Sequence, residues 1–176
     1  IVGQAGQAGF VRNLFQAMVK QPTTAYSPEL LGQLTERFRR DQYHVRNLAV
    51  EVAVVAALDE LRAQVKAGTL TEEEAQTAGL EMLKSVRFGN KDYFFTYNRD
   101  LVAISHPDPK FQGKDLSQMQ DADGVYVLQE IKKKALEEGS GFVPYRWVRL
   151  NEKDPSPKIG YVFHYAPWDW IIGTGV

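Results

Sequence analysis

Residues 89–109, GNKDYFFTYNRDLVAISHPDP, contain the point at which the sequence pattern changes from helix to strand. Upstream of them, apolar residues recur every three or four positions, as they do on one face of a helix. Within them, two short runs rich in aromatic and β-branched residues, DYFFTY and LVAIS, flank the turn signal NRD, and this arrangement predicts a β-hairpin. Because helices come first and strands follow, the sequence predicts an α+β fold.

The region before the hairpin is predicted to be helical. Residues 7–20 have the spacing of a short amphipathic helix, and we assign residues 1–26 to this helix and a proline-containing linker. Ser27 and Pro28 are typical of a helix start. The apolar rhythm that follows predicts one long helix over residues 27–67, about 60 Å in length.

The long helix has two further features in the sequence. Its apolar rhythm from Leu31 to Val55 would allow it to pair with a second copy of itself. After it, Thr71 and Glu74 have the spacing of a capping box, which predicts the start of a second helix over residues 71–86.

Downstream of the hairpin, the sequence predicts one more helix and three more strands. A long polar loop, HPDPKFQGKDLSQMQDADG, ends near Asp123, which is placed to cap a helix running to about Glu138. The strands are expected in GFVPYRWVRL, IGYVFHY and WDWIIGTGV. Residues 91–176 would then form a five-stranded antiparallel sheet with one inserted helix, and residues 27–176 would form one domain.

The composition excludes several classes of function. The chain has 176 residues, of which 44% are hydrophobic and 24% charged, so it can bury a core of its own. The net charge of −1 creates no field that attracts nucleic acid or an anionic membrane. The absence of cysteine excludes disulfides, thiol catalysis and Cys-ligated zinc. No uncharged run approaches the ~20 residues that a membrane-spanning helix requires.

We find no sequence pattern of an enzyme, and none of a metal site. His44, His106 and His164 lack the spacing of metal ligands, and neither a nucleophile elbow nor a pair of catalytic carboxylates can be recognised. The DADG segment resembles part of a calcium loop, but Met119 stands at the first ligand position. We therefore predict no catalytic residue, no metal and no cofactor.

Aromatic residues are dense on the predicted strands. Tyr93, Phe95 and Tyr97 share one face of the first strand because side chains alternate along a strand. Later strands add further aromatic residues and two cations, Arg146 and Lys158. About half of the aromatic side chains are needed for packing, and the others would line a small cavity together with a His and an Arg or Lys. Such a cavity suits a small carboxylate, because a cation takes the charge, Tyr and His donate hydrogen bonds, and aromatic rings contact the alkyl chain.

Four motifs in a fixed order make the chain similar to a known family. They are DYFF in the first strand, HP and GKDL in the polar loop, GFVPYRW, and WDWIIGTGV. With the segments around them, they resemble the single Cache domain, type 2, of bacterial chemoreceptors and related transmembrane sensors. The resemblance covers about residues 45–176.

The resemblance implies a PAS-like antiparallel sheet in a domain that lies outside the cytoplasmic membrane, between two transmembrane helices. The last strand would lead into the second of these helices, so we expect the sequence to be a piece of a longer receptor. Many members of the family bind short carboxylates such as acetate, propionate, pyruvate or lactate, and full receptors are usually dimers. We therefore expect a small carboxylate ligand, a homodimer in the full receptor, no nucleic-acid partner, and membrane contact only through flanking helices.

The family's motifs, carried over position by position, mark seven candidate ligand-binding residues: Arg146, His106, Lys158, Tyr161, Tyr93, Phe95 and Trp147. Arg146 ranks first because of its charge. However, Arg146 and Trp147 are neighbours, and neighbours in a regular strand face opposite sides of the sheet. Both would reach one ligand only if a bulge intervenes or if one of them lies at the rim.

The expected function is that of an extracytoplasmic ligand-binding sensor domain of a receptor in the inner membrane, in the first place a methyl-accepting chemotaxis protein. Three alternatives stay open. The same sensor could belong to a histidine kinase. The domain could have an empty pocket and act as a structural or protein-interaction module. Finally, it could be an intracellular PAS-like domain that binds a cofactor.

Overall fold

The computed structural model describes residues 11–16, 28–40, 45–88, 92–148 and 154–175. The chain divides into two compact units, residues 1–63 and residues 64–176. The predicted boundary after residue 26 stays a prediction, because residues 17–27 lie outside the described part of the chain.

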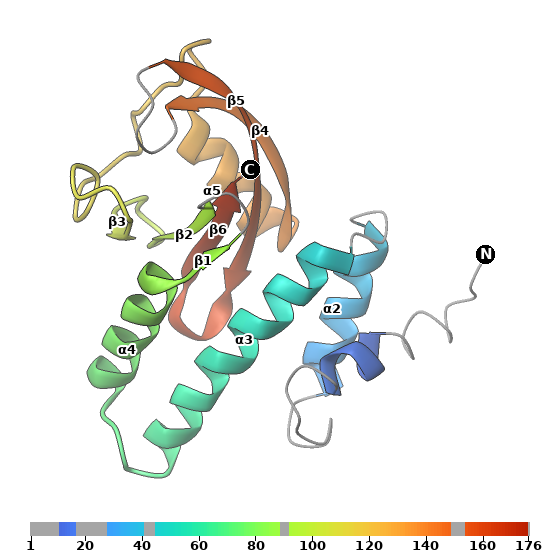
Figure 1. The fold of residues 1–176 in the computed structure, drawn as a ribbon. Coiled ribbons are helices and arrows are strands. Elements are labelled where there is room, and N and C mark those ends of the chain that lie inside the picture. The colour runs from blue at the N-terminus through green and yellow to red at the C-terminus, as the bar shows by residue number, and fades with distance from the viewer. Residues whose placement is uncertain (1–10, 17–27, 41–44, 89–91, 149–153, 176) are drawn as a thin grey trace. The chain divides into compact units, whose positions relative to one another are not determined.

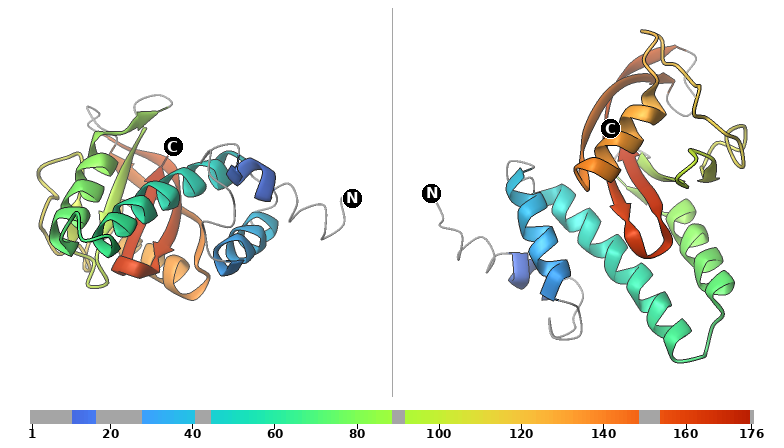
Figure 2. Two further views of the ribbon diagram at one scale, coloured as in Figure 1. Left: turned by 90° about the horizontal axis from the view of Figure 1, so that it is seen from below. Right: turned by 180° about the vertical axis from the view of Figure 1, so that it is seen from behind.

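The first unit contains α2 (Pro28–Arg40) and most of α3 (Val45–Lys66), preceded by a helical stretch over residues 11–16. α2 lies beside α3 (Figure 2). Buried apolar side chains of these helices form one core, which contains Val11, Phe15, Leu34, Leu48 and Val52. The apolar rhythm in this part of the sequence therefore serves packing within the unit.

The prediction of one continuous helix over residues 27–67 is wrong. In a continuous helix, Leu34 and Leu48 would lie about 21 Å apart along the axis. They belong instead to the same core, because α2 and α3 pack against each other. Both side chains are buried there, so these two positions do not form an open face for a second copy.

The junction between α3 and α4 (Glu72–Ser85) follows the sequence prediction. Gly68 has a φ of +73°, and its N–H donates to the carbonyl of Val65 at 3.0 Å at the end of α3. Thr71 Oγ1 accepts a hydrogen bond from the Glu74 N–H at 3.2 Å, and the Glu74 carboxylate accepts one from the Thr71 N–H at 2.8 Å. The predicted capping box is therefore confirmed.

The second unit is built on an antiparallel sheet with the strand order β1-β2-β6-β5-β4 (Figure 1). The strands are β1 (Arg87–Phe88), β2 (Asp92–Tyr97), β3 (Ala103–Ser105), β4 (Ser140–Val148), β5 (Pro155–Tyr165) and β6 (Trp170–Gly175). Among the described residues, six strands fill five positions, because β1 and β3 pair with the two ends of one edge of β2. The predicted α+β fold with a five-stranded antiparallel sheet is confirmed, and the short β1 was not predicted.

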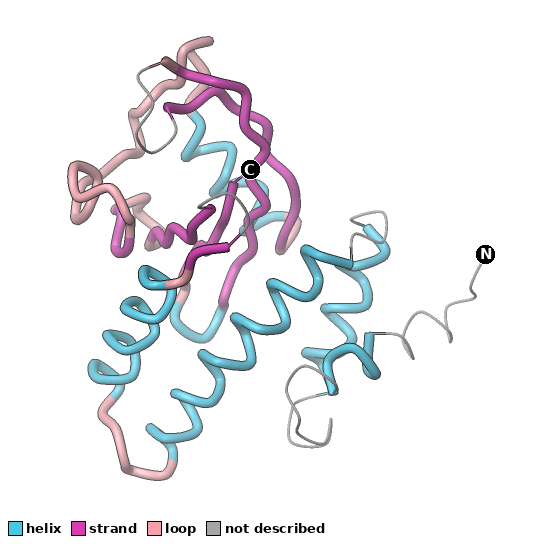
Figure 3. Tube along the Cα trace, in the orientation of Figure 1, coloured by secondary structure: helices cyan, strands magenta, loops and turns pink. Residues whose placement is uncertain are grey.

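One face of the sheet is covered by α5 (Val127–Glu137), which lies across β4 and β5 (Figures 1 and 2). The buried side of α5 packs on the side chains that β2 and β4 point toward it. The predicted helix start at Asp123 is wrong. The helix begins at Val127 with Tyr126 as its N-cap, and the Asp123 N–H donates to the carboxylate of Asp121 at 2.9 Å. A long loop, residues 106–126, connects β3 to α5 (Figure 3).

Polar contacts hold the turn between β5 and β6. The indole N–H of Trp168 donates to the carboxylate of Glu72 in the first turn of α4. The carboxylate of Asp169, which has a φ of +52°, lies 2.7 Å from His164 Nε2 and accepts a hydrogen bond from Arg99 Nη1 at 3.2 Å. Hydrogen bonds from His164 and Arg99 hold the pKa of Asp169 below its usual value, although burial acts in the opposite direction.

Glycines on the face under α5 allow aromatic rings to lie against the backbone of the sheet. Phe95 is the cross-strand partner of Gly173, and a Cβ atom at Gly173 would lie 2.4 Å from Cε2 of the Phe95 ring. A Cβ atom at Gly175 would lie 2.7 Å from the hydroxyl oxygen of Tyr145, and one at Gly160 would lie 3.0 Å from Cε1 of the same ring. These glycines provide the space in which the two rings pack.

We expect Gly173→Ala to destabilise the second unit by about 1–3 kcal/mol, because the added methyl group must displace the Phe95 ring or the strand. Gly32→Ala is the control. A methyl group there meets nothing within 4 Å, and alanine favours α2 by about 1 kcal/mol. Urea unfolding followed by tryptophan fluorescence measures the effect, since all three tryptophans lie in the second unit. A Gly173→Ala midpoint equal to that of the wild type would contradict the packing described above.

Candidate ligand-binding site

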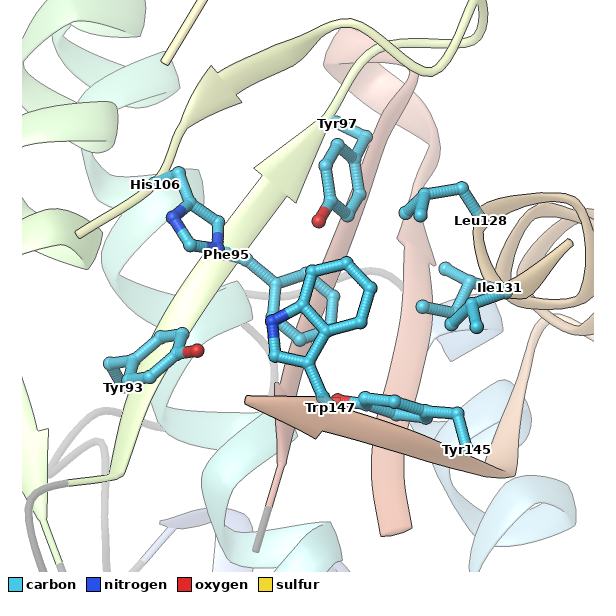
Figure 4. A pocket seen from close by; sticks show the side chains of 9 residues that line it. Tyr93, Phe95, Tyr97, His106, Leu128, Ile131, Tyr145 and Trp147 are labelled. Carbon is cyan, nitrogen blue, oxygen red and sulfur yellow. The ribbon is translucent and has the colours of Figure 1, made fainter. Parts of the chain in front are cut away.

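A cavity lies between β2, β4, α5 and the residue that follows β3 (Figure 4). The residues that line it are Tyr93, Phe95, Tyr97, His106, Val127, Leu128, Ile131, Tyr145 and Trp147. The space between them is about 270 Å³ when the part open to solvent is included, but the centre of a water molecule fits into only about 10 Å³ of it. The site therefore has room for about one water molecule, and a larger ligand requires its side chains to move apart.

Each polar side chain described in the cavity wall has a hydrogen bond to donate. Figure 4 shows the hydroxyl groups of Tyr93 and Tyr97 and the indole nitrogen of Trp147 turned toward the space beside His106. Burial raises the pKa of Tyr97 and of Tyr145 far above the ordinary value, so both hydroxyls keep their protons. None of the described residues that line the cavity carries a carboxylate.

His106 is held in one orientation by its own loop. Its Nδ1 lies 3.0 Å from the amide nitrogen of Asp108 and 3.3 Å from the carbonyl oxygen of that residue. Burial lowers the pKa of His106 to about 4, partly opposed by Asp108 and reinforced by Lys110 and Lys158. The ring is therefore neutral at pH 7. Because Nδ1 accepts the closer contact from the Asp108 N–H, we assign the ring proton to Nε2.

Aromatic packing supports the position of the His106 ring. The ring makes edge contacts with Tyr93 and Phe111, at centroid distances of 5.6 Å and 4.9 Å. Phe111 in turn contacts Trp147 at 5.6 Å, so the loop after β3 and the end of β4 meet above the cavity. The side chain of Gln112 closes this loop by accepting from the His106 N–H at 3.0 Å.

Lys158 brings a buried positive charge to one side of the cavity. Its side chain is 6% exposed, and its Nζ lies 5.2 Å from the centroid of the Tyr93 ring. On the sheet, Lys158 is the cross-strand partner of Tyr145, so both side chains belong to the face that α5 covers. Lys158 thus adjoins two lining residues without itself lining the cavity.

Arg146 and Tyr161 lie on the other face of the sheet. Strand alternation places Trp147 at the cavity and Arg146 opposite to it, and Arg146 Nη2 donates to the carbonyl of Pro155 at 3.3 Å. Tyr161 contacts Phe142 at 5.3 Å between ring centroids. The structure thus brings together four of the seven predicted residues, with Lys158 beside them. The ranking of Arg146 as the first ligand contact stays a prediction. Its place on the face opposite the cavity does not favour that role.

Five residues that line the cavity were not predicted: Tyr97, Tyr145, Val127, Leu128 and Ile131. The alternation rule contained the signal for two of them, since Tyr97 follows Phe95 by two positions and Tyr145 precedes Trp147 by two. The residues of α5 carried no such signal, because the sequence does not say which cavity an amphipathic helix faces.

Comparison with known proteins places the chain in a family. Residues 40–176 match the family model described as single Cache domain 2. The chain belongs to this family. The Cache domain is 38% identical over 111 residues to the methyl-accepting chemotaxis protein McpP of Pseudomonas putida, and 32% identical over 112 residues to the sensor histidine kinase MctS of Rhizobium johnstonii. These matches cover 62% and 63% of the chain but 20% and 24% of the relatives, so the Cache domain spans about a fifth to a quarter of their length.

Two solved structures share the fold of this Cache domain. A periplasmic sensor domain of a chemotaxis protein has a TM-score of 0.71 and 31% identity, and the match covers 77% of this chain and 94% of that one. A Cache chemosensory domain known for carboxylic acid recognition has a TM-score of 0.68 and 31% identity, with 86% and 98% covered. In the described part of the chain, no helix is both long enough and apolar enough to cross a membrane.

The low pKa of His106 predicts how the stability of the Cache domain depends on pH. An unfolded histidine has a pKa of about 6.5. Because the folded pKa of His106 is about 4, the unfolded chain binds more protons between these values, and stability falls as pH decreases from 6.5 toward 4. The contribution of this one residue is about 3 kcal/mol. His106→Asn keeps an acceptor for the Asp108 N–H but removes the titration, so its urea-unfolding free energy should lose less over this range. Equal pH profiles for wild type and variant would contradict the buried, neutral ring.

Proposed function

We propose that this Cache domain is the extracytoplasmic sensor of a bacterial transmembrane receptor, and that it binds a short monocarboxylate in the cavity between β2, β4 and α5. The observation that supports the proposal is a small cavity whose described polar side chains all have a hydrogen bond to donate, with the ammonium group of Lys158 beside it. The Cache domain with 31% identity that is known for carboxylic acid recognition adds support from a related fold.

A carboxylate fits this set of groups better than other small polar ligands. Its two oxygens accept from the hydroxyls of Tyr93 and Tyr97 and from His106 Nε2–H, and Lys158 offsets its charge. The alkyl end of the ligand then contacts Leu128 and Ile131. The small free volume restricts the ligand to a few carbon atoms, because each further methylene group requires a wider opening.

The same set of groups disfavours α-amino acids. Their ammonium group needs an acceptor, and burying it without one costs several kcal/mol. The described lining residues offer no carboxylate to pair with it, and a neutral tyrosine hydroxyl is a weaker acceptor for an ammonium group than a carboxylate is.

The output of the receptor lies beyond the sensor, and we propose a chemotaxis protein rather than a histidine kinase. The relatives include one of each kind, and the chemotaxis protein has the higher identity. A periplasmic position is supported by the similarity to a periplasmic sensor domain. We further propose that the full receptor is a homodimer. Because Leu34 and Leu48 are buried, its contact would use positions of α2 and α3 other than these two.

A thermal-shift screen tests the proposed ligand class. We expect acetate, propionate, pyruvate or lactate to raise the melting temperature, with a stabilisation of about 2.7 kcal/mol for a ligand present at 100 times its Kd. Propionamide, which matches propionate in size, should have no effect because it lacks the charge. Alanine, which matches lactate in size, should have none because it adds an ammonium group. A flat response to all short acids would favour the structural-module alternative, and a response to alanine would contradict the proposed selection against an ammonium group.

Lys158 and Arg146 can be compared directly by calorimetry with the acid that responds best. We expect Lys158→Met to weaken binding roughly 10- to 150-fold, since it removes one charge-assisted interaction of about 1.5–3 kcal/mol. Arg146→Met should stay within about twofold of the wild type, because the guanidinium lies on the opposite face of the sheet. The reverse order of effects would assign the charge of the ligand to Arg146 and would overturn the geometry proposed here.

A further inference from the structure

The carboxylate of Asp121 joins three backbone N–H groups from two segments of the chain. Its Oδ1 accepts from the N–H groups of Asp123 and Val125, at 2.9 Å and 3.0 Å. Its Oδ2 accepts from the N–H of Arg146 on β4, at 3.1 Å and 25 residues away in sequence. The Asp121 N–H also donates to the carbonyl of Val125 at 2.9 Å, which closes the turn on itself. Asp121 therefore ties a rigid turn of the loop before α5 to the β-sheet.

The bond to Arg146 holds an edge strand. In the described sheet, β4 is a terminal strand that pairs with β5 on one side only. Arg146 stands opposite Pro157, which has no N–H to contribute to the ladder, and the N–H of Arg146 points away from β5 to Asp121. The bond from Asp121 therefore holds the outer edge of β4, on the side away from its ladder with β5.

Arg146, whose N–H donates to Asp121, lies between two residues whose side chains line the cavity. Tyr145 and Trp147 flank Arg146 and line the cavity, with ring centroids 6.0 Å apart. Because the backbone of Arg146 connects Tyr145 to Trp147, a shift of the Arg146 amide also shifts the backbone that carries both rings. The loop before α5 also contacts this part of β4 at a second point, where the ring of Phe111 packs against Trp147.

We propose that Asp121 is a positioning residue of the ligand site, one that holds β4 and its two aromatic side chains at the distance from α5 that binding requires. This inference rests on the proposed function, since it concerns the affinity of the same site. Asp121 itself is not among the residues that line the cavity. Burial alone would raise the pKa of Asp121, but the N–H groups of Arg146, Val125 and Asp123 hold it below its usual value, so the carboxylate stays ionised.

The substitution Asp121→Asn removes the hydrogen bond to β4 but keeps the hydrogen bonds within the local turn. The amide oxygen of asparagine can keep the two bonds from Asp123 and Val125, whereas its NH₂ group then faces the N–H of Arg146 and cannot accept from it. Asp115→Asn is the matched control. The Asp115 carboxylate accepts from the Ser117 N–H at 2.8 Å in the same loop, and its described side-chain hydrogen bond does not involve β4.

We expect Asp121→Asn to bind propionate about 10-fold more weakly in calorimetry, and Asp115→Asn to stay within about twofold of the wild type. Hydrogen exchange at the amides of Arg146 and Trp147 should be faster in Asp121→Asn and unchanged in the control. This second readout does not need the ligand. If the wild type binds no short acid, the proposed function fails, and the exchange data alone decide whether Asp121 holds the strand.

Arg146→Pro removes the same hydrogen bond from the other side, and it serves if Asp121→Asn does not fold. Proline is tolerated on an edge strand where the N–H is not part of the ladder. Its control is Arg146→Met, which loses the side chain but keeps the N–H. One result would overturn the proposal: faster hydrogen exchange at Trp147 with unchanged propionate affinity, in either variant. It would show that the hydrogen bond between Asp121 and Arg146 holds the strand without affecting the ligand site. Unchanged exchange would overturn the proposal as well.

Discussion

The contact of aromatic rings with bare glycine backbone is the constraint on which this site depends. Phe95 lies against Gly173, and the Tyr145 ring passes over Gly160 to reach Gly175. Tyr145 starts on β4, and its hydroxyl group ends above β6, so it crosses the whole width of β5. The hollow between these two rings and α5 exists because side chains are absent at those three positions. A sheet with ordinary residues there would fill the same volume with its own core.

The chemistry of the cavity follows from its burial. Water is nearly excluded, so each polar group in the wall must keep the protonation state that costs least without solvent. For Tyr97 and Tyr145 this is the neutral hydroxyl, and for His106 it is the neutral ring, with Nδ1 satisfied by the backbone of its own loop. In the proposed function, this wall of neutral groups with hydrogen bonds to donate, beside the ammonium group of Lys158, favours an anion before any ligand arrives. Preorganised donors of this kind lose little free energy to reorientation on binding.

The sequence predicted the sheet well and the helices before it less well, for a physical reason. Strand pattern is local: alternation and turn residues identified every strand except the two-residue β1 and placed Tyr93, Phe95 and Trp147 on one face. Whether an apolar rhythm continues as one helix or folds back on itself depends on contacts between distant residues such as Leu34 and Leu48, and a local pattern does not contain them. For the same reason charge alone ranked Arg146 above Lys158, although the strand register turns Arg146 away from the cavity and brings Lys158 toward Tyr93.

The small free volume of the cavity has a mechanical consequence. A ligand larger than water has to move the rings of the wall, and it favours the open arrangement only by its differential affinity for the two states. When Tyr145 moves, its hydroxyl group moves against Gly175. The Lys158 side chain lies next to the same glycine, with Cε 3.4 Å from the position that a Cβ atom would take there. A side chain at position 175 could absorb that displacement by changing its rotamer. Glycine has no rotamer to change, so the displacement acts on the backbone of β6 itself. If the cavity binds a ligand as proposed, the glycines that make room for it would also be the positions at which its occupation acts on the last strand.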